Sequence, residues 1–177
     1  MSGHSHWAGI KHKKEVTDQK RGKIFSKLLS AISVAAKSEP NPDFNPRLRT
    51  AIEKAGEASV PQENIGRAIK RASEAEQDLE ELTFEAYGPG GAAILIEAVS
   101  DNRNRTVAEV KKILNESSGK WAEVGSVRWA FEPGNERGEW IAKFPQELSG
   151  EDNAKLNALV GALEEHDDVQ CVYTNAR

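Results

Sequence analysis

Hydrophobic residues recur at helical spacing in the first part of the chain. Ile24, Leu28, Ile32 and Ala35 follow one another at intervals of three or four residues, which places them on one face of an α-helix. The pattern predicts a helix over about residues 18–37. Three lysines follow the same spacing, so this helix is also expected to carry a basic stripe on a separate face.

Two further helices are expected after a segment that contains three prolines. Asn45 is typical of an N-cap, and Pro46 is typical of the first helical position. Pro61 opens the next helix, with Glu63 in its first turn. Three short amphipathic helices can bury their apolar faces only against one another, so we expect a three-helix bundle over residues 18–72.

The pattern changes in the second part of the chain. The acidic segment SEAEQDLEEL has no apolar periodicity and is interpreted as a linker. From Ala92 onward the expected order is βαββαβ, the ferredoxin-like pattern, preceded by one extra strand. We therefore predict an α+β protein with a basic N-terminal arm (1–17), a helical bundle (18–72), an acidic linker (73–82) and a ferredoxin-like domain (83–177).

The composition is that of a globular protein. Of the 177 residues, 38% are hydrophobic, which is enough for one good core or two small ones. No apolar stretch approaches the roughly 18 residues of a membrane-spanning helix, and the N-terminus lacks the apolar region of a secretory signal. Because Cys171 is the single cysteine, neither a disulfide nor a cysteine-based zinc site is expected. We expect a soluble, cytoplasmic protein with no membrane partner.

Charge is distributed unevenly along the chain. Residues 1–71 contain 14 Lys and Arg against 7 Asp and Glu, a net charge of +7. Residues 72–177 contain 10 against 21, a net charge of −11. A basic end on an acidic body suggests a polyanion as partner. The alternative is that the two surfaces attract each other within the chain.

The cations of the basic end, with one tryptophan, are the candidates for binding nucleic acid. Trp7 either stacks on a base or pins the arm to the bundle. Phosphate-directed cations suit DNA as well as ribosomal or messenger RNA. The residues predicted for this surface are Trp7, Lys11, His12, Lys13, Lys14, Lys20, Arg21, Lys23, Lys27, Arg47, Arg67, Lys70 and Arg71.

The motif DNRNRT, between a strand and a helix, offers a second candidate contact with phosphate. Arg103 and Arg105 would lie near the positive end of the helix dipole, which disfavours cations. A bound phosphate, held by the two guanidinium groups and the free backbone N–H groups, would resolve this conflict. The alternative is that the arginines pair with local carboxylates such as Asp101 or Glu109.

Two other motifs are assigned structural roles. GPGG lacks the Lys-Ser/Thr of a phosphate loop and is predicted to be a hairpin turn. RGEWIAKF matches the RNA-recognition signature at Arg137, Gly138 and Phe144, but its base-stacking positions hold Glu139 and Ile141. A base-stacking sheet is therefore not expected, and the tryptophans are predicted to cover the core.

The sequence offers no constellation of catalytic residues. His4, His6 and His12 are clustered, but no neighbouring Cys, Asp or Glu completes a metal site. No nucleophile–base pair or carboxylate dyad stands out. We predict neither an enzyme nor a metal or cofactor site.

Together, these motifs resemble the YebC/PmpR family. The similar segments, which follow the family's order, are GHSHWAGIKHKK, KRGKIFSKL, NPRLRTAIEKA, VPQENIGRAIKR, EAYGPGGAAILIEAVSDNRNRT, GSVRWAFE and LSGEDNAKLNALVGALEEHDDVQCVY. The family comprises bacterial cytoplasmic proteins described as probable DNA-binding transcriptional regulators. Its relatives include the mitochondrial translational activator of cytochrome c oxidase subunit I, and some members are linked to the ribosome. The resemblance implies a gene-expression factor without catalytic activity.

Two features of this chain depart from the family's pattern. Members usually carry a further α/β domain where this chain has only PGNERGEWIAKFPQE, which indicates a short form. His6 and Gly9 replace a lysine and an asparagine expected in the opening motif. We predict a nucleic-acid-binding regulator of gene expression, foremost a DNA-binding transcriptional regulator. An RNA-binding translation factor at the ribosome and a protein-interaction adaptor are the alternatives.

Overall fold

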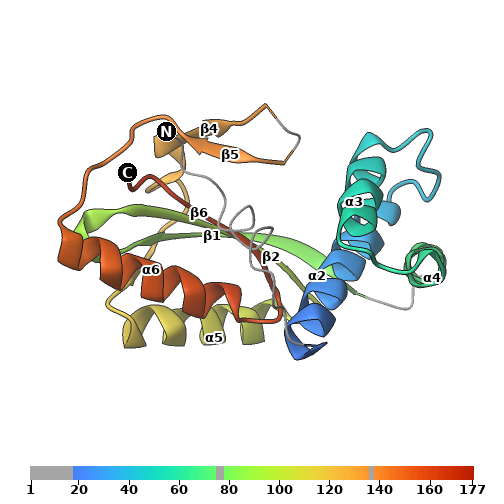
Figure 1. Cartoon of the computed structure of the whole chain (residues 1–177), viewed down its shortest axis with the longest axis horizontal. Helices are drawn as coiled ribbons and strands as arrows, with labels where there is room; N and C mark the ends of the chain where they lie inside the picture. Colours follow the sequence, from blue (N-terminus) through green and yellow to red (C-terminus); the bar gives the residue numbers. More distant parts are fainter. Residues whose placement is uncertain (1–17, 75–77, 136–137) are drawn as a thin grey trace. The chain divides into compact units, whose positions relative to one another are not determined.

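A computed structural model describes residues 18–74, 78–135 and 138–177 of the chain (Figure 1). The chain forms two compact units. The helical unit contains the described residues from Asp18 to Glu81 together with Val99–Asn102. The α/β unit contains Leu82–Ala98 and Arg103–Arg177 among the described residues. Within the described part of the chain, no helix has the length and apolar character needed to cross a membrane.

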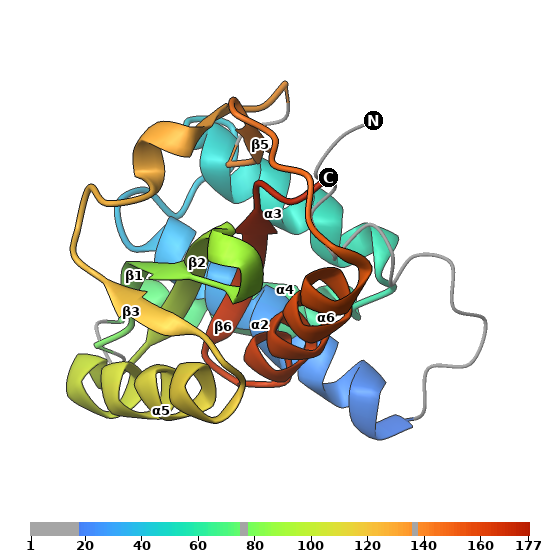
Figure 2. The same cartoon turned by 90° about the vertical axis from the view of Figure 1, so that its left-hand side faces the viewer.

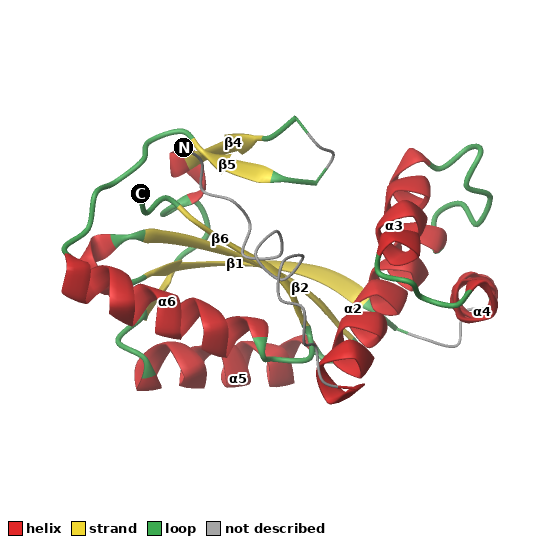
Figure 3. Ribbon diagram, in the orientation of Figure 1, coloured by secondary structure: helices red, strands yellow, loops and turns green. Residues whose placement is uncertain are grey.

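The helical unit is built from three helices, drawn in red in Figure 3: α2 (Asp18–Ala36), α3 (Pro46–Glu57) and α4 (Gln62–Ser73). Helix α2 contacts both α3 and α4. Ile32, Leu48 and Ala55 are completely buried, and Ile65 is nearly so. The predicted three-helix bundle is confirmed, because each helix turns its apolar stripe toward the other two.

Asn45 joins the end of α2 to the start of α3. As predicted, it caps α3: its side-chain Oδ1 accepts a hydrogen bond from the Leu48 N–H at 3.0 Å. The same side chain donates from Nδ2 to the carbonyls of Ala35 and Glu39, both at 2.7 Å. The buried amide thus satisfies one free N–H of α3 and two carbonyls at and beyond the end of α2.

The α/β unit contains a four-stranded sheet with the strand order β3-β1-β2-β6. Helices α5 and α6 lie together on one face of it (Figures 1 and 2). Ile94, Ile96, Leu114, Leu159 and Leu163 form part of the core between the helices and the sheet. The bounds are β1 (Glu80–Tyr87), β2 (Ala93–Ser100), α5 (Arg103–Glu116), β3 (Lys120–Ala122), α6 (Gly150–Glu164) and β6 (Val169–Thr174).

A separate two-stranded sheet, β4 (Phe131–Pro133) and β5 (Trp140–Ala142), covers the opposite face. Its core side contains Phe131, which packs with Leu95 and Tyr173 of the large sheet. Strand β2 is buried along nearly its whole length, so both of its faces need a cover. The helices supply one cover and the β4–β5 hairpin supplies the other.

The α+β class and the order of the predicted helices and strands are confirmed, with four differences in detail. The predicted extra strand, β1, lies inside the sheet between β3 and β2. The predicted neighbours β4 and β5 form their own sheet, and the short β3 was not predicted. Strand β1 begins at Glu80 rather than Thr83, because Leu82 already alternates with Phe84 and Ala86 into the core.

The GPGG motif forms the turn between β1 and β2, as predicted. The Gly88 N–H donates to the Ala92 carbonyl at 2.8 Å and closes the turn. Gly90 and Gly91 adopt φ values of 69° and 77°, a conformation that strongly favours glycine. The motif therefore serves chain reversal.

Candidate nucleic-acid interface

The first turns of helix α2 carry a cluster of exposed cations. Lys20, Arg21 and Lys23 all project from the surface of the helical unit. Within the described residues, neither Lys20 nor Arg21 forms an ion pair. No carboxylate among the described residues therefore neutralises their charge, and a phosphate could contact it.

Lys27 does not belong to this exposed cluster, contrary to the prediction. Its exposed fraction is 8%. It lies three residues after Ile24 and four before Ala31, so it sits between apolar positions of the same helix. Because α2 packs against both α3 and α4, more of its surface is covered than a single apolar stripe implies. Lys27 is a buried residue of the bundle rather than part of an open surface.

Helix α4 and the start of α3 carry the remaining predicted cations of the helical unit. Arg67 lies 3.8 Å from the Glu63 carboxylate and 2.5 Å from the Asn64 side-chain oxygen. Lys70 lies 3.8 Å from Glu74. Arg47, at the start of α3, pairs with Glu81. Arg71 is exposed and forms no ion pair with any described residue. Of these four predicted cations, Arg47, Arg67 and Lys70 thus pair with carboxylates, whereas Arg71 has no such partner among residues 18–74 and the other described residues.

The predicted residues Trp7, Lys11, His12, Lys13 and Lys14 lie outside the described residues. Their assignment to the nucleic-acid surface stays a prediction. The described part of that surface therefore rests on α2, α3 and α4.

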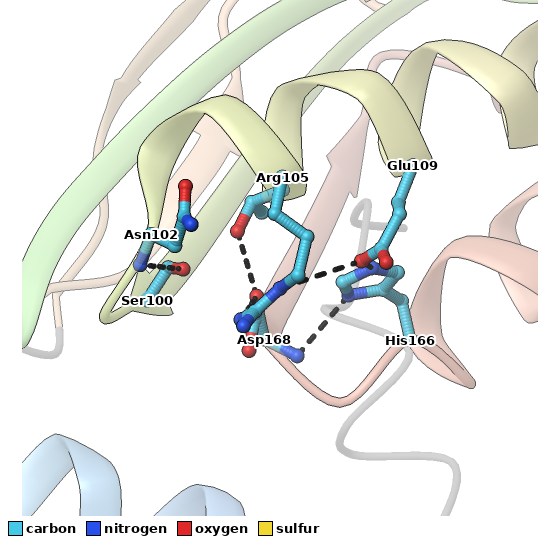
Figure 4. A network of polar contacts seen from close by, with 7 residues as sticks. Ser100, Asn102, Arg105, Glu109, His166 and Asp168 are labelled. Atoms are coloured by element: carbon cyan, nitrogen blue, oxygen red, sulfur yellow. Dashed lines mark hydrogen bonds and ion pairs between the residues drawn. The ribbon is translucent and has the colours of Figure 1, made fainter.

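Arg103 and Arg105 behave differently from each other. Both lie in the first turn of α5, which contains no acidic residue. The Arg105 guanidinium is 2.8 Å from the Asp168 carboxylate and 3.9 Å from Glu109 (Figure 4). Arg103 is exposed and has no ion-pair partner among the described residues. Arg105 is therefore paired with carboxylates, as the alternative had it, but its shorter contact is to Asp168, distant in sequence, and only the longer one is to the local Glu109. Phosphate binding stays a prediction for Arg103.

Around Arg105, a polar network ties α5 to the segment between α6 and β6. Thr106 donates to Asp168 at 2.6 Å, and the Asp168 N–H donates to His166 Nδ1 at 3.1 Å. The other ring nitrogen of His166 is 2.7 Å from Glu109. Glu109, His166 and Asp168 are close enough together to hold a metal ion. Because the Arg105 guanidinium already supplies a cation to two of these groups, we explain the cluster as a structural network.

Single substitutions should separate the roles of the two arginines. Arg105→Gln is expected to lower the free energy of unfolding by up to about 1 kcal/mol, since the ion pair is partly exposed. Arg103→Gln should leave stability unchanged and weaken nucleic-acid binding. Thermal unfolding and a binding titration on both variants test this. Equal losses of stability would assign both side chains to the fold.

Two features escaped the sequence prediction. Trp129 is 63% exposed and touches the half-exposed ring of Phe144, although the tryptophans were predicted to cover the core. Trp121 and Trp140 do pack against the two cores of the α/β unit. The second feature is the buried carboxylate of Glu85, which accepts backbone hydrogen bonds from the loop before β4. The segment RWAF gave no signal for the first feature, because Phe131 is buried whereas Trp129, two residues before it, is exposed.

The fold and these surfaces define a class of protein: a helical unit with exposed cations, followed by an α/β unit. Residues 5–75 match the model of the TACO1/YebC protein N-terminal domain. Residues 79–135 and 132–176 match the model of the TACO1/YebC second and third domain. The chain belongs to the TACO1/YebC family.

Individual relatives agree with this assignment. A relative from Chloroherpeton thalassium is 41% identical over 238 residues, covering 99% of this chain and 95% of the relative. One from Dictyoglomus turgidum is 46% identical and covers 93% of this chain, which spans 66% of that relative. Both carry the name "Probable transcriptional regulatory protein". A crystal structure of a conserved hypothetical protein from Aquifex aeolicus matches with a TM-score of 0.86 at 35% identity, over 98% of this chain and 97% of that one.

The comparisons also fit the expected short form. The model of the second and third domains matches in two parts that meet at about residues 132–135. The alignment with the Chloroherpeton relative is 238 residues long, although this chain has 177. It must therefore pass over a segment of the relative that has no counterpart here. The junction between the two parts falls at β4, at the start of the separate hairpin.

Proposed function

We propose that this protein binds nucleic acid through the exposed cations of its helical unit and thereby regulates gene expression in the cytoplasm. The observation that carries the proposal is the exposure of Lys20, Arg21 and Arg71, which have no ion-pair partner among the described residues. Unneutralised cations on a surface attract polyanions and release counterions when they meet phosphates. The names of the relatives support a regulatory role.

DNA-bound transcriptional control is the first form of this proposal. It agrees with the name carried by the relatives, and helices with exposed cations suit the phosphate backbone of a duplex. Action on RNA at the ribosome is the second form. The exposed Trp129–Phe144 pair favours it, because unpaired bases in RNA stack on aromatic rings. A protein-interaction adaptor is the outcome if neither nucleic acid binds.

The triple variant Lys20→Gln, Arg21→Gln, Arg71→Gln tests the proposal. All three side chains are exposed, so the variant is expected to keep its fold. If each cation meets one phosphate, the slope of log affinity against log salt should flatten by about 2.7 on duplex DNA and about 2.1 on a single strand. Sequence preference should hardly change, because phosphate contacts carry no sequence information. A salt titration on duplex DNA and on single-stranded RNA measures both slopes.

A matched control removes the same charge from the other unit. Lys112, Lys120 and Lys155 are exposed lysines of the α/β unit, and their replacement by glutamine should leave the slope within error of wild type. An unchanged salt slope in the folded triple variant would place the nucleic-acid surface elsewhere. A wild-type protein that binds neither duplex nor single strands would support the adaptor.

A further inference from the structure

Two aromatic rings lie exposed side by side on the α/β unit. The exposed fractions are 63% for Trp129 and 51% for Phe144. Their ring centroids are 5.6 Å apart and the rings are inclined by 49°. Single exposed apolar side chains need no explanation, but large neighbouring rings at a surface often mark a binding site.

The backbone holds these rings in place. The Trp129 indole N–H donates to the Ser126 carbonyl at 2.7 Å. Ala130 accepts hydrogen bonds from the N–H groups of Lys143 and Phe144, at 2.8 and 3.4 Å, and this brings Phe144 beside Trp129. Neither ring therefore has to be ordered when a ligand arrives, which reduces the entropy lost on binding.

The loop that carries Trp129 is itself held in place by hydrogen bonds to a buried side chain. The buried carboxylate of Glu85 accepts hydrogen bonds from the N–H groups of Gly125, Val127 and Arg128, at 2.6, 2.7 and 3.0 Å. Val127 and Ala130, which flank Arg128 and Trp129 in the sequence, are almost completely buried. Because both flanking residues are anchored in the core, the two residues between them are exposed together.

Cations accompany the aromatic rings. The Lys143 ammonium lies 5.6 Å from the centroid of the Phe144 ring. The Arg128 guanidinium lies 4.5 Å from the centroid of the Trp140 ring. Both cationic residues are exposed. Lys143 thus lies beside an exposed ring, whereas Arg128 lies over the half-buried Trp140 and next to Trp129 in the sequence. Single-stranded nucleic acid binds to such combinations, with bases on the rings and phosphates on the cations.

We infer that Trp129 and Phe144 form a stacking platform for unpaired bases of a single-stranded nucleic acid, with Lys143 and Arg128 placed for the adjoining phosphates. This inference deepens the proposed function and rests on it. An apolar protein interface fits less well, because the flanking residues are charged and a standard interface buries about 800 Å² per partner. The residues from 72 to 177 have a net charge of −11, so binding here should depend on stacking more than on charge.

The test compares Trp129→Ala/Phe144→Ala with wild type on a single-stranded RNA 12-mer, the same sequence as single-stranded DNA, and the DNA duplex. Loss of stacking should weaken binding to the single strands by about tenfold or more. The salt slope should change little, since no charge is removed. Affinity for the duplex, whose bases are already stacked, should stay unchanged. Replacing Trp129 by phenylalanine instead of alanine keeps an aromatic ring and should recover most of the lost affinity. Comparing the affinities for the RNA and DNA strands shows whether the platform prefers ribose or deoxyribose.

Val124→Ala is the matched control, because Val124 is a 91% exposed apolar residue of the same unit. Unchanged single-strand affinity in a folded double variant would overturn the inference, as would an equal loss on the duplex. A change in sedimentation of the variant without a change in binding would instead assign the rings to self-association. A wild-type protein that binds duplex but no single strand would overturn this inference and leave the proposed function standing.

Discussion

Replacing Glu85 by glutamine is expected to lower the free energy of unfolding of the α/β unit by about 3 kcal/mol, since hydrogen bonds to a buried charged group contribute about 1.5–3 kcal/mol. Glu85 is 4% exposed, and its two oxygens accept three backbone N–H bonds of 2.6–3.0 Å. An amide offers one oxygen and turns an NH₂ group toward another N–H. At least one backbone donor would be left without an acceptor.

The loss should depend on pH. Burial raises the pKa of Glu85, but hydrogen bonds from Gly125, Val127 and Arg128, with the charge of Arg128, outweigh it and lower the pKa below its ordinary value of 4.5. A lowered carboxyl pKa gives stability that is fully present above the unfolded value and is lost as the pH falls through the folded value. The difference between wild type and Glu85→Gln should therefore be full at neutral pH and shrink well below pH 4.5.

Urea unfolding at neutral and acid pH measures both quantities. Glu123→Gln, at an exposed position near the same loop, is the control and should leave stability within about 0.5 kcal/mol of wild type. A pH-independent difference would contradict the assignment of a charged carboxylate. Because the same loop carries Trp129, Glu85→Gln should also weaken binding to single strands more than binding to duplex.

The second large effect is expected in the helical unit. Asn45→Ala should lower the free energy of unfolding by roughly 3 kcal/mol, because it removes an N-cap worth about 1 kcal/mol and two hydrogen bonds of about 1 kcal/mol each. The two carbonyls that the amide serves, those of Ala35 and Glu39, would lose this donor. Thermal or urea unfolding measures the loss.

Ser149→Ala is the matched control for this variant. Ser149 caps α6 in an exposed position, where its side chain accepts one hydrogen bond from the Asp152 N–H at 3.1 Å. Its replacement should cost only about 1 kcal/mol. Ser149 also donates to the exposed Asp152 carboxylate at 2.9 Å, so the larger loss in Asn45→Ala is expected to come from the two bonds from its amide to the carbonyls of Ala35 and Glu39. Equal losses would mean that these two bonds contribute nothing.

Local signals in the sequence were sufficient to predict the helices and most of the strands. Asn45 and Pro46 predicted the start of α3, because capping and a fixed φ act on neighbouring residues alone. The period of the apolar residues predicted α2 for the same reason. The three-residue strand β3 was missed, since Lys120–Ala122 is too short to show an alternating pattern.

Features that depend on distant residues could not be predicted. Lys27 is buried because α2 packs against two helices at once, and its own spacing indicates only a stripe. Arg105 is paired because Asp168, distant in sequence, lies across from it. The exposure of Trp129 depends on the backbone bonds to Glu85, from another strand, and on the anchoring of Val127. Tertiary packing, rather than local preference, decides which of these side chains meets solvent.

The isolation of the β4–β5 hairpin has a consequence for how this architecture can be altered. In the described part of the chain, the hairpin shares no backbone ladder with the four-stranded sheet, so a change in length between β4 and β5 leaves the register of the larger sheet intact. The entropy of closing a loop grows slowly, by about 0.6 kcal/mol for each doubling of its length. The end of the hairpin is therefore a natural graft point. A reporter domain inserted there should leave both cores folded. For the same reason, a whole domain can be gained or lost at that position during evolution without changes in the rest of the fold.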